Sequence, residues 1–321
     1  MTESNLDIPR SSNQKALREI ARAMIGTAPG GRLETSVEYQ ERLGIGAGTA
    51  QKALRSLVSS GAAVIRSHGH RGTYLVERDL GRLWQIAELG PVRVLFTPPG
   101  AVEEYGLADG LQRAFEDLAV PLSTSYRRGA AQRAALVADG RADLTVVSHG
   151  AAFESDLDIV RYHTIDLGPD TYYRPDSIVV VTPRHAATPP RRIGVDRGSH
   201  DHQRLTMAEF PDDGSWEYVD CRFPDIPAAV LEGRIDAGVW HRMELLVPLH
   251  LAGLAERPLR SERAIEARTA LSSAVLLADR GNMPAIGLLT ELDVATVRMR
   301  QDAVLDLEPD SEDFREQIWP R

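Results

Sequence analysis

The sequence has a single cysteine, Cys221, among 321 residues, so no disulfide can form within the chain. Only two of its 37 basic residues are lysines, Lys15 and Lys52, a bias that we attribute to a GC-rich genome. No apolar run approaches the roughly 18 residues of a membrane-spanning helix, and residues 1–18 lack the apolar core of a signal peptide. These absences predict a cytoplasmic protein that makes no contact with a membrane.

Charge divides the chain into two parts. The net charge is −9, but residues 1–80 carry +3 and residues 81–321 carry −12. Between residues 43 and 76 there is no acidic side chain, whereas four basic side chains and two histidines fall there. A solvated surface that happens to be basic would explain this charge, and so would a polyanionic partner.

The secondary-structure pattern of this segment favours the polyanion. Apolar residues at helical spacing predict helices over residues 13–25, 37–43 and 47–60. Alternating residues predict short strands over 62–66 and 73–76, joined by a glycine-containing hairpin. This order is a winged helix-turn-helix, whose third helix enters the major groove of double-stranded DNA while the wing reaches the adjacent backbone. The candidate DNA contacts are Gly48, Thr49, Gln51, Lys52, Arg55, His68, His70 and Arg71.

The segment also resembles the GntR-type winged helix. The resemblance is carried by residues 31–33, 43–45, 53–57, 60–62 and, most specifically, 71–76. The sequence departs from the GntR pattern at Gly46, Ala47 and Gly48, where a Ser-Arg-Thr run would open the recognition helix. Because three phosphate-binding side chains are missing, we expect other contacts at that end of the helix.

The rest of the chain alternates strand and helix signals. Strands are predicted over 92–96, 122–126 and 144–147, with helices over 107–118 and 130–138. The same order then restarts, with strands over 192–195, 216–219 and 237–240 and helices over 202–210 and 226–232. Residues 135–143 recur 93 positions later as 228–236, each copy with a glycine that can end a helix and an aspartate that opens a strand. Either two related lobes or one common junction used twice would produce this repeat.

Two apolar segments, 177–181 and 270–278, would connect such lobes, which is the plan of type II periplasmic binding proteins. The predicted fold class is therefore α/β, with an N-terminal winged helix-turn-helix followed by a two-lobed α/β domain. A final helix over 284–305 would pack on the first lobe. The predicted domains are a DNA-binding domain at 1–78, a linker at 79–90 and an effector-binding domain at 91–321, in which lobe I comprises 91–180 with 270–321 and lobe II comprises 181–269.

Both halves together resemble the YhfZ-type regulators, a GntR-like winged helix fused to a binding-protein-like domain. The carriers in the second half are residues 106–108, 128–130, 146–148, 167–169, 171–172 and 194–196. The resemblance implies a transcriptional regulator and leaves its signal open. An enzyme, such as a transferase on the same two-lobed fold, is the alternative, and it would need a convergent acid–base pair that the sequence does not show.

Ligands of open α/β sheets bind beyond the carboxyl ends of the strands, where helix N-termini carry partial positive charge. A carboxylate or phosphate would suit a site made by Arg127 or Arg128 and opposed by Ser199 and His200. The alternative is that either arginine pairs with a carboxylate on the protein surface. We therefore expect a small anionic effector. The candidate ligand-binding residues are Thr97, Tyr126, Arg127, Arg128, Gly129, Ser148, His149, Thr171, Tyr172, Ser199, His200 and Trp240, of which Trp240 would equally suit core packing.

Other chemistry is weakly indicated. The pairs His200 with His202 and His68 with His70 have metal-compatible spacing but no third ligand nearby in sequence, so we expect no metal. Ser148 and the adjacent histidine would point to opposite faces of a strand, which is a poor nucleophile–base arrangement. No phosphate-binding or dinucleotide loop is present, so no cofactor is expected. The predicted partners are double-stranded DNA, a small effector and a second copy of the chain, because palindromic half-sites require a dimer.

Overall fold

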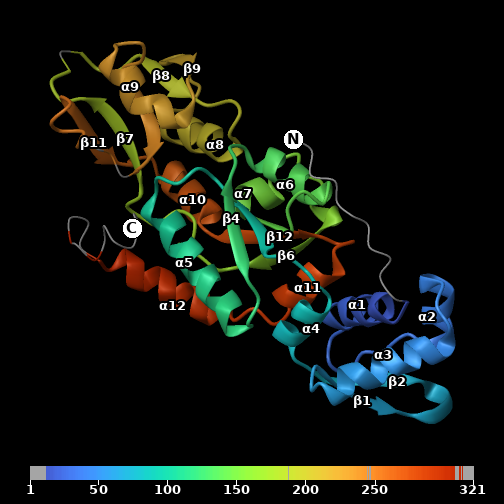
Figure 1. Ribbon diagram of the computed structural model, residues 1–321. Coiled ribbons are helices and arrows are strands. Elements are labelled where there is room, and N and C mark those ends of the chain that lie inside the picture. The colour runs from blue at the N-terminus through green and yellow to red at the C-terminus, as the bar shows by residue number, and fades with distance from the viewer. Residues whose placement is uncertain are drawn as a thin grey trace, which may run out of the picture. The chain divides into compact units, whose positions relative to one another are not determined.

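The computed structural model describes residues 12–186, 188–243, 245, 247–307, 311 and 313. The chain folds into two compact units (Figure 1). Unit 1 comprises Met1–Val92, Phe115–Ser123 and Arg280–Leu292, and unit 2 comprises Arg93–Ala114, Thr124–Asp279 and Asp293–Arg321. No helix of the described ranges is long and apolar enough to cross a membrane.

Unit 1 contains the predicted winged helix-turn-helix. Its helices are α1 (Ser12–Ile25), α2 (Ser36–Leu43) and α3 (Ala47–Ser59), and its wing is the antiparallel pair β1 (Ala63–Ser67) and β2 (Thr73–Arg78). The hydroxyl of Thr35 accepts from the backbone N–H of Glu38, whose carboxylate accepts from the N–H of Thr35, which is a complete capping box. Gly44 then ends α2 at a φ of 65°, a left-handed conformation that favours glycine.

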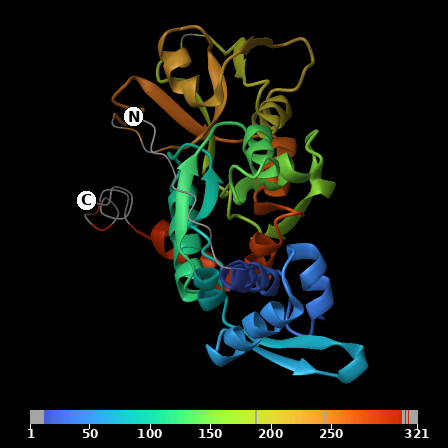
Figure 2. The same ribbon diagram turned by 45° about the vertical axis from the view of Figure 1, so that its right-hand side comes forward.

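The wing is short and tightly closed. A single turn of 3₁₀ helix, η1 (Gly69–Arg71), occupies its tip, and Gly72 returns the chain into β2 at a φ of 100°. Figure 2 shows the hairpin lying along α3. The basic side chains of helix and wing are therefore held by the same small core.

Two flanking segments hold helices that differ from the expectation. The segment 79–90, whose role as a linker stays a prediction, contains α4 (Leu80–Ile86), because the carboxylate of Asp79 caps its N-terminus by accepting from the backbone N–H of Arg82. The predicted final helix is two helices, α11 (Met283–Leu289) and α12 (Val294–Leu305). The chain breaks between them because Asp293 caps α12, accepting from the N–H groups of its first turn.

Helix α11 belongs to unit 1, where it packs on the end of α1. Gly26 and Gly287 allow this approach: a Cβ on Gly26 would stand 2.7 Å from the Cβ of Met283, and a Cβ on Gly287 would overlap the carbonyl of Ile25. The contact is fastened by Arg78, whose guanidinium is almost fully buried. It donates to the carbonyl oxygens of Ile25, Thr27 (2.7 Å) and Gly287 (3.1 Å) and pairs with Glu291 at 3.0 Å.

Unit 2 contains two five-stranded sheets, the first of which forms lobe I. Its strand order is β4-β3-β5-β12-β6, in which β3 and β5 are parallel and β12 runs antiparallel to both of its neighbours. The helices α6 and α7 pack on this sheet through a buried apolar cluster. The elements are β3 (Val92–Phe96), α5 (Val102–Asp117), β4 (Leu122–Tyr126), α6 (Ala130–Ala138), β5 (Leu144–Ser148), α7 (His149–Phe153), η2 (Ile159–Arg161), β6 (Tyr162–Asp166) and β12 (Ala274–Asp279).

The second sheet forms lobe II, with the strand order β11-β7-β10-β8-β9. The strands β8, β9 and β10 are parallel, as expected for repeated β-α-β units, and β7 is antiparallel to β10. Helices α8 and α10 contribute to one buried cluster of this lobe and α9 to another. The elements are β7 (Ile178–Pro183), β8 (Arg192–Val195), α8 (His200–Glu209), β9 (Glu217–Asp220), η3 (Phe223–Asp225), α9 (Ile226–Leu231), β10 (Ala237–His241), β11 (Leu254–Pro258) and α10 (Glu262–Leu271).

The internal repeat performs the same structural task in both lobes. Gly140 and Gly233 follow their helices at φ values of 68° and 69°. The next aspartate in each copy then binds an arginine near the start of a strand of the same lobe: Asp143 pairs with Arg93 of β3 at 3.0 Å, and Asp236 pairs with Arg192 of β8 at 2.6 Å. This shared partner lies outside the nine-residue repeat, so the equivalence of the lobes extends beyond a common junction.

The two crossings between the lobes are bonded to each other. The hydroxyl of Thr171 accepts from the N–H of Ala274 at 2.8 Å and donates to the carbonyl of Gly168 at 2.6 Å. The N–H of Tyr172 donates to the carbonyl of Ser272 at 2.7 Å. These bonds hold the crossings together where the chain passes from one sheet to the other.

Candidate DNA-binding face and effector site

The outward side of α3 carries the predicted DNA contacts. Ala50, Ala53 and Leu57 face the core, which leaves Gln51, Lys52 and Arg55 exposed on the opposite side. Gly48 is exposed as well and Thr49 is half-buried. The helix thus presents an amide, a hydroxyl and two cations to solvent, the groups with which proteins bind base edges and phosphates.

The wing adds further cations to this face. His68, His70 and Arg71 are exposed at its tip, and the ring of His68 meets that of Tyr74 edge-on at 5.3 Å. Arg66 on β1 is also exposed, although it was not among the predicted contacts. We call Lys52, Arg55, Arg66 and Arg71 the basic face. None of these four cations forms an ion pair with a residue that the structure describes.

Within unit 2, charged groups from lobe I and lobe II meet. The imidazole Nε2 of His241, at the end of β10, lies 3.5 Å from a carboxylate oxygen of Glu103 in the first turn of α5. The carboxylate of Glu154, just after α7, pairs with Arg204 of α8. The hydroxyl of Tyr173, in the crossing, donates to Oδ2 of Asp201 in the first turn of α8 at 2.9 Å.

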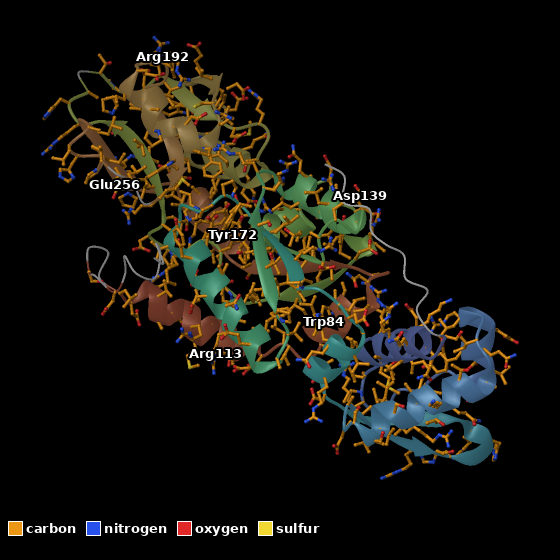
Figure 3. All side chains as sticks on the ribbon, viewed as in Figure 1. Trp84, Arg113, Asp139, Tyr172, Arg192 and Glu256 are labelled. Carbon is orange, nitrogen blue, oxygen red and sulfur yellow. The ribbon has the colours of Figure 1, made fainter. Side chains whose placement is uncertain are left out.

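Around these contacts lies a set of buried ionisable and aromatic side chains. Tyr172, which is labelled in Figure 3, belongs to this set. Its hydroxyl interacts electrostatically with Arg133, Glu104 and Asp201. Its ring meets that of Tyr173 edge-on at 4.8 Å, and Tyr173 in turn meets the ring of His241 at 5.1 Å. We call this set the interlobe cluster: Glu103, Glu104, Arg133, Tyr172, Tyr173, Asp201 and His241.

Burial sets the protonation of this cluster. It raises the pKa of Glu104 to about 7, and it raises the pKa of Asp201 above the usual range of an aspartate. Burial also opposes the charged forms of His241 and Glu103, but the attraction between them across 3.5 Å, together with smaller contributions from other neighbours, outweighs it, so the pKa of His241 is raised and that of Glu103 is lowered. Both shifts favour the charged forms that make the ion pair.

The structure brings some predicted ligand residues to this cluster. Ser148 is buried, caps α7 by accepting from the N–H of Ala151 at 3.1 Å, and stabilises the ionised form of Asp201 through its hydroxyl. Ser199 caps α8, and the imidazole of His200 lies 3.8 Å from the carboxylate of Glu154. These residues and Tyr172 come from three separate segments of unit 2.

Other predicted ligand residues lie elsewhere. Trp240 is buried in the apolar cluster of α9, so it packs in the core of lobe II, and the hydroxyl of Thr171 is occupied in the crossing. His149 lies beside Asp166, with its Nδ1 3.4 Å from the carboxylate. The remaining candidates lie in the loops after β3 and β4, where Thr97 is half-buried and Tyr126, Arg127, Arg128 and Gly129 are exposed.

Sequence reasoning missed most of the interlobe cluster. Glu103 and Glu104 lie in the first turn of α5, which begins five residues before the predicted start of that helix. Gly106 and Gly110 of this helix serve close packing: a Cβ on Gly110 would stand 2.5 Å from the carbonyl oxygen of Val297 in α12. The signal that could have revealed the turn is the Glu103-Glu104 pair itself, since acidic residues favour a helix N-terminus.

The metal-compatible histidine pairs are not assembled into a site. His202 is buried with both ring nitrogens engaged: Nδ1 accepts from the N–H of Asp196 at 3.0 Å, and Nε2 lies 2.7 Å from the carbonyl of Val239. This pairing orders the loop before α8. Burial lowers the pKa of His202. Among the described residues no group of three or more His, Cys, Asp or Glu side chains is placed to hold a metal ion.

Comparison with known proteins places this architecture in a family. The model of the YhfZ C-terminal domain matches residues 79–311, and a helix-turn-helix domain model matches residues 28–75. YhfZ of Escherichia coli (strain K12) is 29% identical over 243 residues, which cover 76% of this chain and 79% of that protein. The two domain matches indicate a DNA-binding regulator with an effector-binding-like domain, whereas the GntR-type resemblance of the first segment stays a prediction.

A solved structure shares the fold. The crystal structure of YhfZ from Shigella flexneri aligns with a TM-score of 0.54 at 24% identity, covering 73% of this chain and 98% of that one. The periplasmic aliphatic sulphonate binding protein SsuA from Escherichia coli aligns with a TM-score of 0.47 at 16% identity, covering 71% of this chain and 76% of that one. Since the domain model spans well over half of the sequence, the chain belongs to the YhfZ C-terminal domain family.

Proposed function

We propose that this protein is a transcriptional regulator that binds double-stranded DNA as a cytoplasmic homodimer and is controlled by a small effector bearing an anionic group, bound between its two lobes. It acts by binding and not by catalysis. The observation that carries this proposal is the basic face, four exposed cations without a described carboxylate partner, in a chain of net charge −9. Cations that pair with no carboxylate of the protein itself are available to bind phosphates of DNA.

The effector part of the proposal is supported by Arg133. Its side chain is 2% exposed, and its guanidinium donates to the carbonyls of Arg127 (2.9 Å) and Val146 (3.1 Å) and to the hydroxyl of Thr145 (3.3 Å). These acceptors are neutral, and no described carboxylate lies within ion-pair distance of it. A buried guanidinium is stabilised by a negative charge, which an anionic ligand would supply.

Effector binding would control DNA affinity by favouring one arrangement of the lobes. A ligand that binds between two lobes stabilises the arrangement in which both contact it, and DNA selects among arrangements of the paired winged helices. The effector and DNA must therefore change each other's affinity by the same factor. A ligand that binds the protein without changing its DNA affinity would contradict this part of the proposal.

The salt dependence of DNA binding tests the basic face. With four cations in each protomer, a dimer neutralises about eight phosphates, so the slope of log K against log salt should be about −7. Fluorescence anisotropy with a labelled mixed-sequence duplex should then show affinity falling by about 10⁴ between 50 and 200 mM salt. A response that is nearly flat would exclude the basic face as a phosphate-binding surface.

A double variant with a matched control locates the effect. Changing Lys52→Gln and Arg55→Gln removes four of the eight cations of a dimer and should reduce the slope by about half. Arg234→Gln removes an equally exposed arginine of lobe II, which pairs with Glu232 at 2.6 Å, and should leave the slope unchanged. Equal effects of the two changes would show that net charge, and not the winged helix, governs DNA binding.

A further inference from the structure

The interlobe cluster contains buried acceptors that lack donors, in addition to the buried cation. Asp201 is 5% exposed, and while its Oδ2 accepts from Tyr173, its Oδ1 has no hydrogen-bond partner. Oε2 of Glu104 is likewise buried and unpartnered. Buried polar atoms are almost always paired, because each unpaired one loses its bonds to water without replacement. Two such carboxyl oxygens in one cluster therefore indicate a place where donors from a bound molecule are received.

The neighbouring groups leave these two acceptors open. The hydroxyls of Ser148 and Tyr173 stabilise the carboxylate of Asp201, but neither is bonded to Oδ1. Glu103 and His241 compensate each other's charge as an ion pair. Arg133 is held by the carbonyls of Arg127 and Val146 and lies within electrostatic range of both Asp201 and Glu104, but no ion pair joins it to either. The cluster thus combines a cation at Arg133 with acceptors at Asp201 and Glu104, beside the rings of Tyr172 and Tyr173.

The charges discriminate among ligand classes. A dianion would place negative charge beside Asp201 and Glu104, and a simple amine would leave Arg133 without an anion. A molecule with a carboxylate and an ammonium group provides both missing partners. The ammonium can also lie against the aromatic rings, whose faces attract cations.

We propose that the effector is a small zwitterion of the amino-acid type, whose carboxylate binds Arg133 and whose ammonium group donates to Asp201 and Glu104. This inference rests on the proposed function, since it specifies the ligand of the same interlobe site. It also places the ligand deeper in the lobes than the exposed Arg127 and Arg128. These two arginines lie exposed after β4 and would not contact the ligand's ammonium group.

A matched panel of probes tests the inference on the full-length protein. Thermal unfolding at pH 7.5 would be measured with each common amino acid in both enantiomers, with the 2-hydroxy acid that replaces its amine by a hydroxyl, and with the amine that lacks its carboxylate. We expect at least one amino acid to stabilise the protein and, by calorimetry, to bind about 100-fold more tightly than both of its analogues, since an analogue lacking a group leaves buried partners unpaired. Equal binding of a 2-hydroxy acid or an amine, or no stabilisation by any amino acid, overturns the inference.

Isosteric variants assign the contacts. Asp201→Asn removes the charge that faces the ammonium group and should weaken the amino acid by at least about tenfold while affecting its 2-hydroxy acid little. Asp225→Asn makes the same change at a half-buried position of lobe II outside the interlobe cluster, where Asp225 pairs with Arg222, and should leave the affinity unchanged. If Asp201→Asn binds the amino acid as wild type does, the acceptor end is misassigned and the inference fails.

DNA binding separates failure of this inference from failure of the proposed function. Steep salt dependence in the ligand-free protein, together with an absence of amino-acid binding, would overturn the zwitterion and leave the regulator. Amino-acid binding by a protein with no affinity for the duplex would overturn the regulator and leave a zwitterion-binding protein.

Discussion

The contact between α1 and α11 makes a sharp prediction about glycine. In an exposed helix, Gly→Ala stabilises by up to about 1 kcal/mol, because glycine loses more backbone freedom on folding. Gly287 lies inside α11, so propensity alone predicts that Gly287→Ala stabilises the protein. The structure predicts the opposite, because the added Cβ would overlap the carbonyl oxygen of Ile25 and stand 2.8 Å from its carbonyl carbon.

The magnitude follows from what must move. Separating the two helices by enough to admit a methyl group costs about 1–3 kcal/mol in overpacking. The carbonyl of Ile25 also accepts from Arg78, and weakening this buried bond adds about 1–2 kcal/mol. After subtracting the gain in helix propensity, we expect Gly287→Ala to lower the free energy of unfolding by about 1–4 kcal/mol.

Gly48→Ala is the matched control. Gly48 is also helical, in α3, but a Cβ there would meet no atom within 4 Å, so this change should stabilise by about 0.5–1 kcal/mol. Urea unfolding followed by circular dichroism, with scanning calorimetry as a second measure, would give both values. If Gly287→Ala stabilises as Gly48→Ala does, α11 does not pack against α1 at the distance described, and the reasoning is refuted.

Three further predictions concern buried or paired charges. Arg78→Ala should lower the free energy of unfolding by about 3–5 kcal/mol, because three buried carbonyls lose their donor. Arg66→Ala, at the solvent-exposed wing, should change the free energy of unfolding by no more than about 0.5 kcal/mol. Similar values for the two variants in urea unfolding would contradict the buried role of Arg78. Burial raises the pKa of Glu104 to about 7, so the folded protein loses stability as pH rises from about 4.5 to 7. Glu104→Gln should therefore stabilise the protein by about 3 kcal/mol at pH 8 and have little effect at pH 4.5. A stability difference that does not change with pH would show that Glu104 is not buried as an acid. Hydrogen bonds from Arg192 lower the pKa of Asp236 to about 2, so this pair stabilises the folded protein above about pH 4, and its contribution is lost as pH falls toward 2. Asp236→Asn should remove this pH dependence of the stability. An acid unfolding transition that the variant leaves unchanged would exclude the pair as its source.

The elements that could be predicted from sequence are those with a strong local signal. The capping box at Thr35 and the left-handed Gly44 define α2 by contacts within ten residues, and α3 follows from the spacing of Ala50, Ala53 and Leu57. The exposure of Lys52 on the opposite face then follows from helical geometry alone. The same holds for β3, β4, β5, β8, β9 and β10, whereas the edge strands β6 and β11 were not predicted.

The failures share a different cause. The helix predicted over 107–118 begins earlier, at Val102, and Gly110 within it admits the backbone of α12, which lies almost 190 residues away in sequence. The final helix was taken as one because Asp293, which caps α12, was not recognised as a boundary. Arg133 was missed because an arginine in an alanine-rich helix gives no sign that it is buried.

By itself the sequence determined the order of helices and strands, the basic reading segment and the two-lobed plan, since each depends on residues that are neighbours along the chain. Only the tertiary structure decided which side chains meet between the lobes. Asp201, Glu104 and Arg133 come from three separate helices. The interaction among their charges depends on how deeply they are buried and on the distances between them. Desolvation depends on everything that surrounds a group, and no local pattern of residues records it.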